Sequence, residues 1–229
     1  TRMNILCLDQ GGWVNPSEYP TVAADWESHV ISDFSYNPNT RQLPEDYPVN
    51  DLGSPISPLM WNGVGGSTIQ WGAHFPRLHP SDFRVRTLDG VADDWPLDYA
   101  TLEPYYDLND RMMGVSGLSG NPAYPPKSAQ TPPVSLGRLG TTMAEGFNRL
   151  GWHWWPADSA IVSQDYEGRE ACVNAGVCMF GCAKGSKAST DITYWPSAVR
   201  RGVRIETRCR VREITLGSNG LADGVVYVD

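Results

Sequence analysis

The feature that most constrains this chain is a short apolar run near its start that ends in an acid and two glycines. The run is Asn4-Ile-Leu-Cys-Leu-Asp9, and Gln10-Gly-Gly12 follows it. An apolar run of this length is typical of a buried parallel strand, and paired glycines are typical of a tight turn at its carboxyl end. The sequence therefore predicts a buried parallel strand that ends at Asp9.

Composition excludes several classes of protein. The chain has 229 residues, of which 41% are hydrophobic and 19% charged, as in ordinary globular domains. Its 23 Gly and 18 Pro residues predict many turns and long loops. The net charge is −8, with 26 acidic and 18 basic residues, which argues against nucleic-acid binding. Apolar runs are only a few residues long, so we expect no transmembrane helix.

The two ends of the chain predict a piece from the middle of a longer protein. Thr1 stands where an initiator Met is expected, and the first residues lead directly into the apolar strand without the pattern of a signal peptide. The last residues, Gly224-Val-Val-Tyr-Val-Asp229, have the character of a strand.

Periodicity predicts the main helices and strands. Residues 13–60 show little periodicity and are expected to be irregular, with at most short helices. Helices are predicted at 95–114, with Pro104 in a first turn, at 136–151, with Gly151 as the C-cap, and at 188–201.

Strict alternation from Val203 to Val211 predicts a half-buried strand, or two strands joined by a bend. Residues 222–228 are its predicted hairpin partner, after Gly217-Ser-Asn-Gly220.

Asp9 is the first candidate site residue. In dinucleotide-binding folds an acid that closes a strand binds the ribose hydroxyls, about 20 residues after a G-x-G-x-x-G loop. The chain does not contain that loop upstream of Asp9. The alternative is an acid at an ordinary junction between strand and turn.

A glycine loop, Gly63-Val-Gly-Gly-Ser-Thr68, is the second candidate. It is not G-x-G-x-x-G, because Thr68 stands where the last Gly is needed. Consecutive glycines followed by hydroxyl residues still leave backbone N–H groups open to an anion. Trp61, Trp71 and His74 flank the loop and could enclose a flat ring. The alternative is a tight turn beside a hydrophobic patch.

Three cysteines form the third candidate. Cys172, Cys178 and Cys182 lie close together in the sequence, among glycines. Clustered thiolates suit an iron–sulfur cluster or zinc, and three ligands suit a three-iron cluster or a site completed by another residue. The alternatives are a disulfide with one free thiol, or three buried thiols.

The lysines and histidines near these motifs are further candidate residues. Lys184, Ser186 and Lys187 could neutralise the charge of a cofactor or cluster, or could form a solvated helix start. Among the histidines, His74 and His79 are the better candidates for a base, because His153 lies in an aromatic run that favours packing.

Taken in order, these motifs resemble the glucose–methanol–choline (GMC) family of FAD-dependent oxidoreductases. The segments that carry the resemblance are Ile5–Gly12, Val64–Thr68, Asp94–Tyr106 with Gly114–Gly117, Cys178–Lys187 and Gly202–Ile205. The resemblance implies an α/β fold, made of a partial FAD-binding, Rossmann-like domain and part of an α+β substrate domain.

The domains implied by the resemblance follow the chain in three parts. Residues 1–90 would belong to the FAD-binding domain and include the flavin-contacting loop. Residues 91–165 would form a substrate-domain segment and a connecting helix. Residues 166–229 would hold the cysteine motif, a helix and the strands that return to the FAD domain.

The resemblance also implies roles for particular residues. Asp9 takes the place of the ribose-binding acid, and the backbone of Val211 takes the place that contacts adenine. The residues implied to lie against flavin and pyrophosphate are Gly65, Gly66, Ser67 and Thr68. The chain departs from the family at Ile69-Gln-Trp71, where Asn or His is usual. The catalytic His of the family lies beyond Asp229, so no catalytic residue is assigned here.

The implied activity is oxidation of a CH–OH group of an alcohol or sugar, with hydride transfer to flavin N5 and a His as base. The three-cysteine subgroup resembles the large subunits of bacterial sugar and gluconate dehydrogenases. This implies a [3Fe–4S] cluster on Cys172, Cys178 and Cys182, electron transfer towards a cytochrome, and a small-subunit partner.

Two alternatives remain open: a flavin alcohol oxidase that uses oxygen and has structural cysteines, and a non-catalytic cysteine-rich binding or metal-storage module. The 229 residues alone are expected to be inactive and to bind FAD weakly. The identity of the alcohol stays open, as does a periplasmic or a cytoplasmic location.

Overall fold

A short parallel sheet joins the start of the chain to its last quarter. In the computed structural model, which describes residues 3–22, 24–57 and 59–228, β1 (Leu6–Leu8) pairs with β2 (Arg204–Glu206), with Leu6 opposite Arg204. The N–H of Asp9 continues the ladder by donating to the last carbonyl of β2 at 2.9 Å. The predicted parallel strand is confirmed.

The predicted burial of this strand is wrong. Leu6 is 47% exposed, and Cys7 and Leu8 are only half-buried. The described part of the sheet has two strands, and two strands cover little apolar surface.

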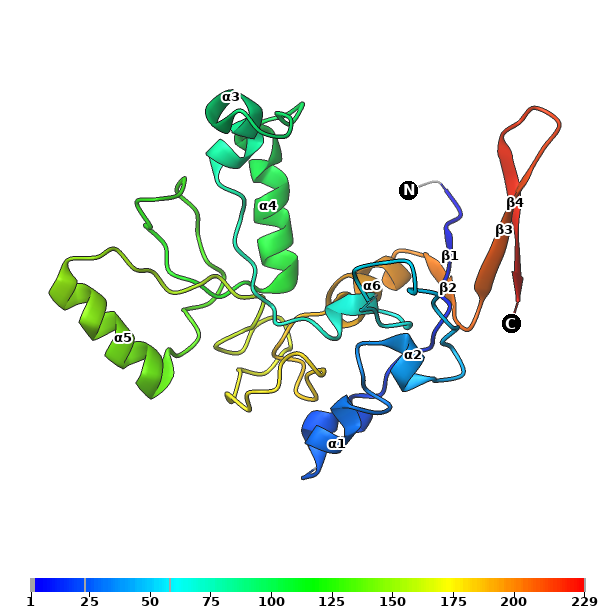
Figure 1. The fold of residues 1–229 in the computed structure, drawn as a ribbon, viewed down its shortest axis with the longest axis horizontal. Helices are drawn as coiled ribbons and strands as arrows, with labels where there is room; N and C mark the ends of the chain where they lie inside the picture. The colour runs from blue at the N-terminus through cyan, green and yellow to red at the C-terminus, as the bar shows by residue number, and fades with distance from the viewer. Residues whose placement is uncertain (1–2, 23, 58, 229) are drawn as a thin grey trace. The chain divides into compact units, whose positions relative to one another are not determined.

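The chain divides into two compact units. The first holds Thr1–Gly72, Ala175–Gly185 and Ser189–Asp229, and the second holds Ala73–Asn174 and Ser186–Ala188. Both combine regular elements with long irregular connections, as the Gly and Pro content predicts (Figure 1).

A β-hairpin ends the first unit. After β2 the backbone bends at Arg208, whose φ is +59°, and enters β3 (Arg210–Leu216). β3 pairs antiparallel with β4 (Ala222–Val228), which Figure 1 shows as a long twisted ribbon. The prediction of two strands joined by a bend, followed by a hairpin, is confirmed.

The other elements of the first unit are short, apart from one helix. The predicted helix at 188–201 is α6 (Thr190–Arg200). The remaining elements are η1 (Pro16–Glu18), η2 (Pro20–Val22), α1 (Trp26–Val30), α2 (Pro38–Arg41) and η3 (Gly66–Thr68). The described residues between 13 and 60 are therefore irregular with short helices, as predicted.

A small aromatic core holds these loops together. Phe34 stacks on Trp61 with ring centroids 4.9 Å apart, and Tyr19 meets Phe34 edge-on at 6.2 Å. Ile69 completes the cluster. The expectation that Trp61 encloses a flat ring of a ligand is wrong, because its side chain is packed inside this core and only 7% exposed.

The second unit contains the longest helices. These are α4 (Tyr99–Met113) and α5 (Gly137–Leu150), and the unit also holds the shorter η4 (Pro80–Arg84) and α3 (Val85–Asp89). The predicted helices at 95–114 and 136–151 are confirmed, and Gly151 ends α5 in the left-handed conformation with φ +68°.

The predicted place of Pro104 in a first turn is wrong. Asp98 caps α4 by accepting the N–H of Thr101 at 2.9 Å, so the helix begins at Tyr99 and Pro104 lies inside it. A proline there leaves one backbone carbonyl without its helical donor.

Extended segments rather than a sheet form the interior of the second unit. Ser116 bridges both Thr131 and Ser159, and Ile161 bridges Lys187. Among the described residues no helix combines the length and the apolar character that crossing a bilayer requires.

A buried arginine anchors α4 to the strand-like segment before η4. The Arg77 guanidinium contacts Asp110 and Asp107, each at 2.6 Å. The side chains of Arg77 and Asp110 are 2% and 5% exposed, whereas that of Asp107 is 47% exposed. The two pairs therefore lie in very different surroundings.

This contrast gives a matched test of stability. Asp110→Ala leaves the buried Arg77 charge without its buried partner and is expected to cost about 3–5 kcal/mol of unfolding free energy. Asp107→Ala removes a half-exposed partner and is expected to cost about 1 kcal/mol or less. Urea unfolding followed by tryptophan fluorescence measures both, and equal losses would contradict this account.

Candidate cofactor site

The site begins at the turn after β1. The Asp9 carboxylate accepts the N–H of Gly11 at 2.9 Å, and its backbone carbonyl accepts the N–H of Cys209 at 2.9 Å. Burial raises the pKa of Asp9, and the hydrogen bond from Gly11 offsets part of that rise. A carboxylate has lone pairs for more than one donor, so this group retains acceptor capacity at the carboxyl end of a parallel strand.

The turn packs directly against the glycine loop. A Cβ on Gly11 would lie 2.1 Å from the backbone oxygen of Asn62, so only glycine fits here. The next carbonyl, that of Gly12, accepts the N–H of Val64 at 3.0 Å. Two motifs more than 50 residues apart in the sequence are thus in backbone contact.

The glycine loop has one closed and one open side. Gly65, with φ +107°, is packed so that an added Cβ would lie 3.0 Å from Asp191 Oδ1. Gly66, with φ +53°, would meet no atom within 4 Å, and Ser67 is exposed. The side formed by Gly66 and Ser67 is therefore open to a ligand.

Thr68 ties this loop to the start of α6. Its hydroxyl oxygen accepts the N–H of Thr190 at 3.0 Å, and the Thr190 hydroxyl donates to the Gly65 carbonyl at 3.2 Å. Sequence reasoning missed Thr190, which lies 122 residues from Thr68. No local pattern marks such a pairing.

A cavity of ≈ 830 Å³ lies beside the Asp9 turn. Gln10, which follows Asp9, and Val211 of β3 both line it. Its full lining is Gln10, Pro44, Glu45, Asp46, Arg208, Arg210, Val211, Arg212 and Val228. The first unit thus combines a strand-terminal acid, an adjacent cavity and an open glycine loop, a set that fits an adenine dinucleotide.

The three clustered cysteines are distributed over both units. Cys172 belongs to the second unit and accepts the N–H of Asn174 at 3.4 Å, whereas Cys178 and Cys182 belong to the first. All three are half-buried thiols, so the alternatives of a disulfide and of fully buried thiols are not what the structure has. Within the described ranges no three His, Cys, Asp or Glu side chains are arranged to hold a metal ion.

The residues that follow the cysteines differ in their exposure to solvent. Lys184 is exposed, in agreement with a solvated position. For Lys187 the interpretation as part of a solvated helix start is wrong, because it is 2% exposed and its backbone bridges Ile161. Ser186 is equally buried and its carbonyl accepts from Arg169 at 2.7 Å.

The three histidines considered as candidates lie in different surroundings. His79 begins η4, where its Nδ1 lies 2.8 Å from the Ser81 hydroxyl and its Nε2 lies 2.6 Å from the carbonyl of Ala123. Its ring is therefore held by local structure. His74 is exposed and belongs to the second unit. His153 contacts Asn121 at 3.1 Å, as expected of a hydrogen-bonded histidine.

Comparison with known families decides the assignment. The profile described as GMC oxidoreductase matches residues 60–229, about three quarters of the chain. The chain belongs to the GMC oxidoreductase family. The match includes the glycine loop and the hairpin.

Relatives within the GMC family are dehydrogenases and oxidases. The chain is 43% identical over 229 residues to 2-methyl-1,2-propanediol dehydrogenase of Mycolicibacterium austroafricanum, covering 98% of this chain and 41% of that protein. It is 34% identical over 128 residues to the fructose dehydrogenase large subunit of Gluconobacter japonicus, covering 54% and 24%. It is 31% identical over 182 residues to paromamine 6'-oxidase of Streptomyces fradiae, covering 75% and 32%. The chain therefore spans less than half the length of these relatives.

The two glycines of the Asp9 turn give a matched pair of variants. Gly11→Ala places a methyl group against the Asn62 backbone and is expected to cost at least about 1–3 kcal/mol of unfolding free energy. At Gly12 the nearest atom to a Cβ is Arg208 Nε at 3.8 Å, so Gly12→Ala is expected to be close to neutral. Chemical denaturation of both variants measures the difference, and equal stability would show that the turn does not pack on the loop.

Proposed function

We propose that the whole protein containing this chain is an FAD-dependent dehydrogenase that acts on CH–OH groups of alcohols or sugars. The observation that carries the proposal is the backbone contact between Gly11 and Asn62. Through it the strand-terminal acid and the open glycine loop belong to one site, in a chain of the GMC family.

Asp9 is proposed to bind the ribose of the adenosine half. One oxygen of its carboxylate is engaged by Gly11, and the other can accept from the ribose hydroxyls. The cavity beside Gln10 would receive adenine, with the backbone of Val211 as the contact at its wall.

The glycine loop is proposed to hold the diphosphate and the flavin edge. Gly65 and Gly66 let the backbone approach closely, because no side chain covers the open side. Ser67 presents an exposed hydroxyl there, while Thr68 fixes the loop to α6. When bound, FAD would accept the hydride from the substrate carbon.

The domain roles follow from these contacts and remain part of the proposal. The first unit carries the proposed FAD contacts, and the second is proposed as part of the substrate domain. The sequence-based boundaries at 90 and 165 are kept as predictions.

The substrate class is supported by the names of the relatives. A small diol is the first substrate to test, because the diol dehydrogenase matches almost the whole chain, and a sugar is the second. Anaerobic mixing of the whole protein with 2-methyl-1,2-propanediol, fructose or gluconate should bleach the flavin absorbance with one of them. No bleaching by any alcohol or sugar would contradict the proposal.

An oxidase is the second candidate, favoured by the similarity to paromamine 6'-oxidase. The two reactions differ in the acceptor that restores the oxidised flavin. Rapid reoxidation by air with formation of hydrogen peroxide would identify the oxidase, and reoxidation only by a dye or cytochrome would identify the dehydrogenase.

We also propose that Cys172, Cys178 and Cys182 hold a [3Fe–4S] cluster in the whole protein, with a cytochrome and a small subunit as partners. The support is their spacing, their thiol state and the similarity to a protein named as a large subunit. The described residues do not include an assembled set of three ligands, so the proposal rests on the spacing, the thiol state and the similarity.

Iron and acid-labile sulfide analysis after anaerobic purification tests the cluster. The proposal expects both elements in the wild type and their loss in Cys178→Ser. Absence of iron and sulfide from wild-type protein that still contains flavin would reject the cluster and leave the flavin proposal intact.

Replacement of the acid tests the FAD site. Asp9→Asn keeps the oxygen that Gly11 binds but removes the charge, and since hydrogen bonds to a charged group contribute about 1.5–3 kcal/mol, the Kd for FAD is expected to rise at least about tenfold. Exposed Glu27→Gln serves as the control and should leave the Kd unchanged. Equal Kd values for the two variants would contradict the proposed role of Asp9.

The same variant has a predicted pH dependence of stability without FAD. Because burial raises the pKa of Asp9, the ionised form at neutral pH costs stability, and protonation restores it as the pH falls through that raised pKa. Asp9→Asn should therefore unfold at a temperature equal to or above that of the wild type at pH 7. The difference should disappear below about pH 4. Thermal unfolding of apoprotein at several pH values measures this.

A further inference from the structure

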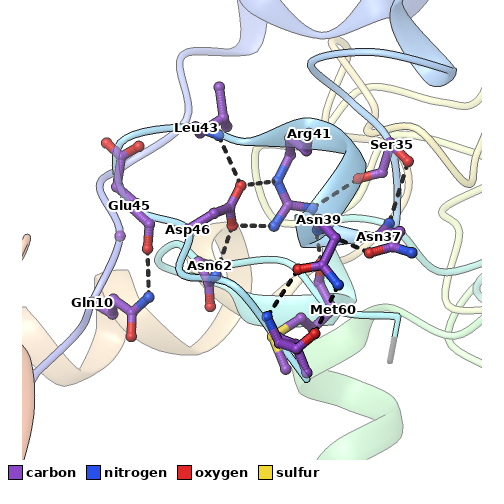
Figure 2. A network of polar contacts seen from close by, with 12 residues as sticks. Gln10, Ser35, Asn37, Asn39, Arg41, Leu43, Glu45, Asp46, Met60 and Asn62 are labelled. Atoms are coloured by element: carbon purple, nitrogen blue, oxygen red, sulfur yellow. Dashed lines mark hydrogen bonds and ion pairs between the residues drawn. The ribbon is translucent and has the colours of Figure 1, made fainter. Parts of the chain in front are cut away.

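A buried ion pair lies at the centre of a polar network in the first unit (Figure 2). The side chains of Arg41 and Asp46 are 1% and 3% exposed. Arg41 Nε donates to Asp46 at 2.8 Å, and a second guanidinium nitrogen contacts the same carboxylate. Its third nitrogen donates to the carbonyls of Ser35 and Met60 at 2.7 and 2.9 Å.

The Asp46 carboxylate also accepts from two further groups. The backbone N–H of Leu43 donates to it at 3.1 Å, and the side-chain amide of Asn62 donates at 2.7 Å. Both oxygens of Asp46 are therefore engaged by protein donors. Although this residue lines the cavity beside Asp9, its charge is directed to Arg41 and Asn62.

The hydrogen bond from Asn62 to Asp46 links this network to the proposed cofactor site. Its backbone oxygen is the atom that a Cβ on Gly11 would meet at 2.1 Å, and the glycine loop begins at the next residue. Beside Asp46, the backbone carbonyl of Glu45 accepts from the Gln10 side chain. The pair Glu45 and Asp46 thus contacts both the Asp9 turn and the glycine loop, as Figure 2 shows for Gln10 and Asn62.

We propose that Asp46 is a positioning residue of the FAD site, which acts through Asn62 to set the spacing between Asp9 and the glycine loop. This inference rests on the proposed function. Both oxygens of the Asp46 carboxylate are engaged by protein donors, so its proposed role is to hold other groups in place. It fixes the Asn62 backbone against Gly11, so the group that binds ribose and the loop that meets the flavin are held at one separation.

The test uses Asn62, because removal of Asp46 would leave Arg41 buried without its partner and would threaten folding. In the whole protein, Asn62→Ala removes one hydrogen bond to Asp46 and leaves the ion pair in place. The control is Asn39→Ala, which removes two hydrogen bonds to Val49 in the same network without touching the Asp9 turn or the glycine loop. The Kd for FAD and the melting temperature of the apoprotein are measured for both.

The expected result is a Kd for FAD about tenfold higher in Asn62→Ala and unchanged in Asn39→Ala. A third variant, Asn62→Asp, places a carboxylate against Asp46. Its Kd should be raised further at pH 8 and should fall towards that of the wild type near pH 5, because a shared proton restores the hydrogen bond. A purely structural loss would not follow this pH profile.

The outcomes separate the two proposals. If wild-type protein binds no FAD, the proposed function itself fails. If wild-type protein binds FAD but Asn62→Ala and Asn39→Ala bind it equally, the positioning role of Asp46 is wrong and the proposed function stands. A ratio of the Asn62→Asp Kd to the wild-type Kd that is the same at pH 8 and at pH 5 also overturns the positioning role.

Discussion

The contact of the Gly11 backbone with Asn62 is the constraint on which the first unit depends. The Asp9 turn and the glycine loop come from distant parts of the sequence, and this contact leaves no room for a side chain between them. The backbone hydrogen bond from the Val64 N–H to the Gly12 carbonyl extends this contact. Backbone packs directly on backbone at this point, which suits the proposed site because that site would bind both ends of a long cofactor.

Buried and half-buried guanidinium groups donate hydrogen bonds to backbone carbonyls in this irregular chain. Backbone carbonyls in long buried loops need donors, and few strands are present in the described residues to supply them. Arg41 serves the carbonyls of Ser35 and Met60, and Arg169 those of Met113 and Ser186. Acidic partners such as Asp46 offset the cost of burying the charge. An acid beside a buried arginine thus holds the loops in place as well as balancing the charge.

Sequence predicts the local elements of this molecule well, and for physical reasons. The alternation from Val203 and the glycine after α5 are encoded within a few residues, so the hairpin and the helix end follow directly. The predicted burial of β1 is wrong. An apolar run shows that a strand is suited to burial, but it does not show how many neighbouring strands or helices cover that strand. Pro104 lies inside α4 rather than in its first turn, because the cap at Asp98 starts the helix at Tyr99.

The candidate site could be predicted only in part. Asp9 and the residues from Gly65 to Thr68 stand out from residue type and order, and their roles in cofactor binding stay predictions. The roles of Asp46 and Thr190 depend on partners that lie far along the chain, and no local pattern marks them. Gly11 and Gly12 look equivalent in sequence, yet only the packing of Gly11 excludes a side chain.

A crystal structure of the whole protein with FAD tests the central claim most directly. The account predicts that the ribose hydroxyls bind Asp9, that adenine lies in the cavity lined by Val211, and that the flavin end of the cofactor lies against the open side of Gly66 and Ser67. FAD bound elsewhere, with Asp9 away from the ribose, would contradict it.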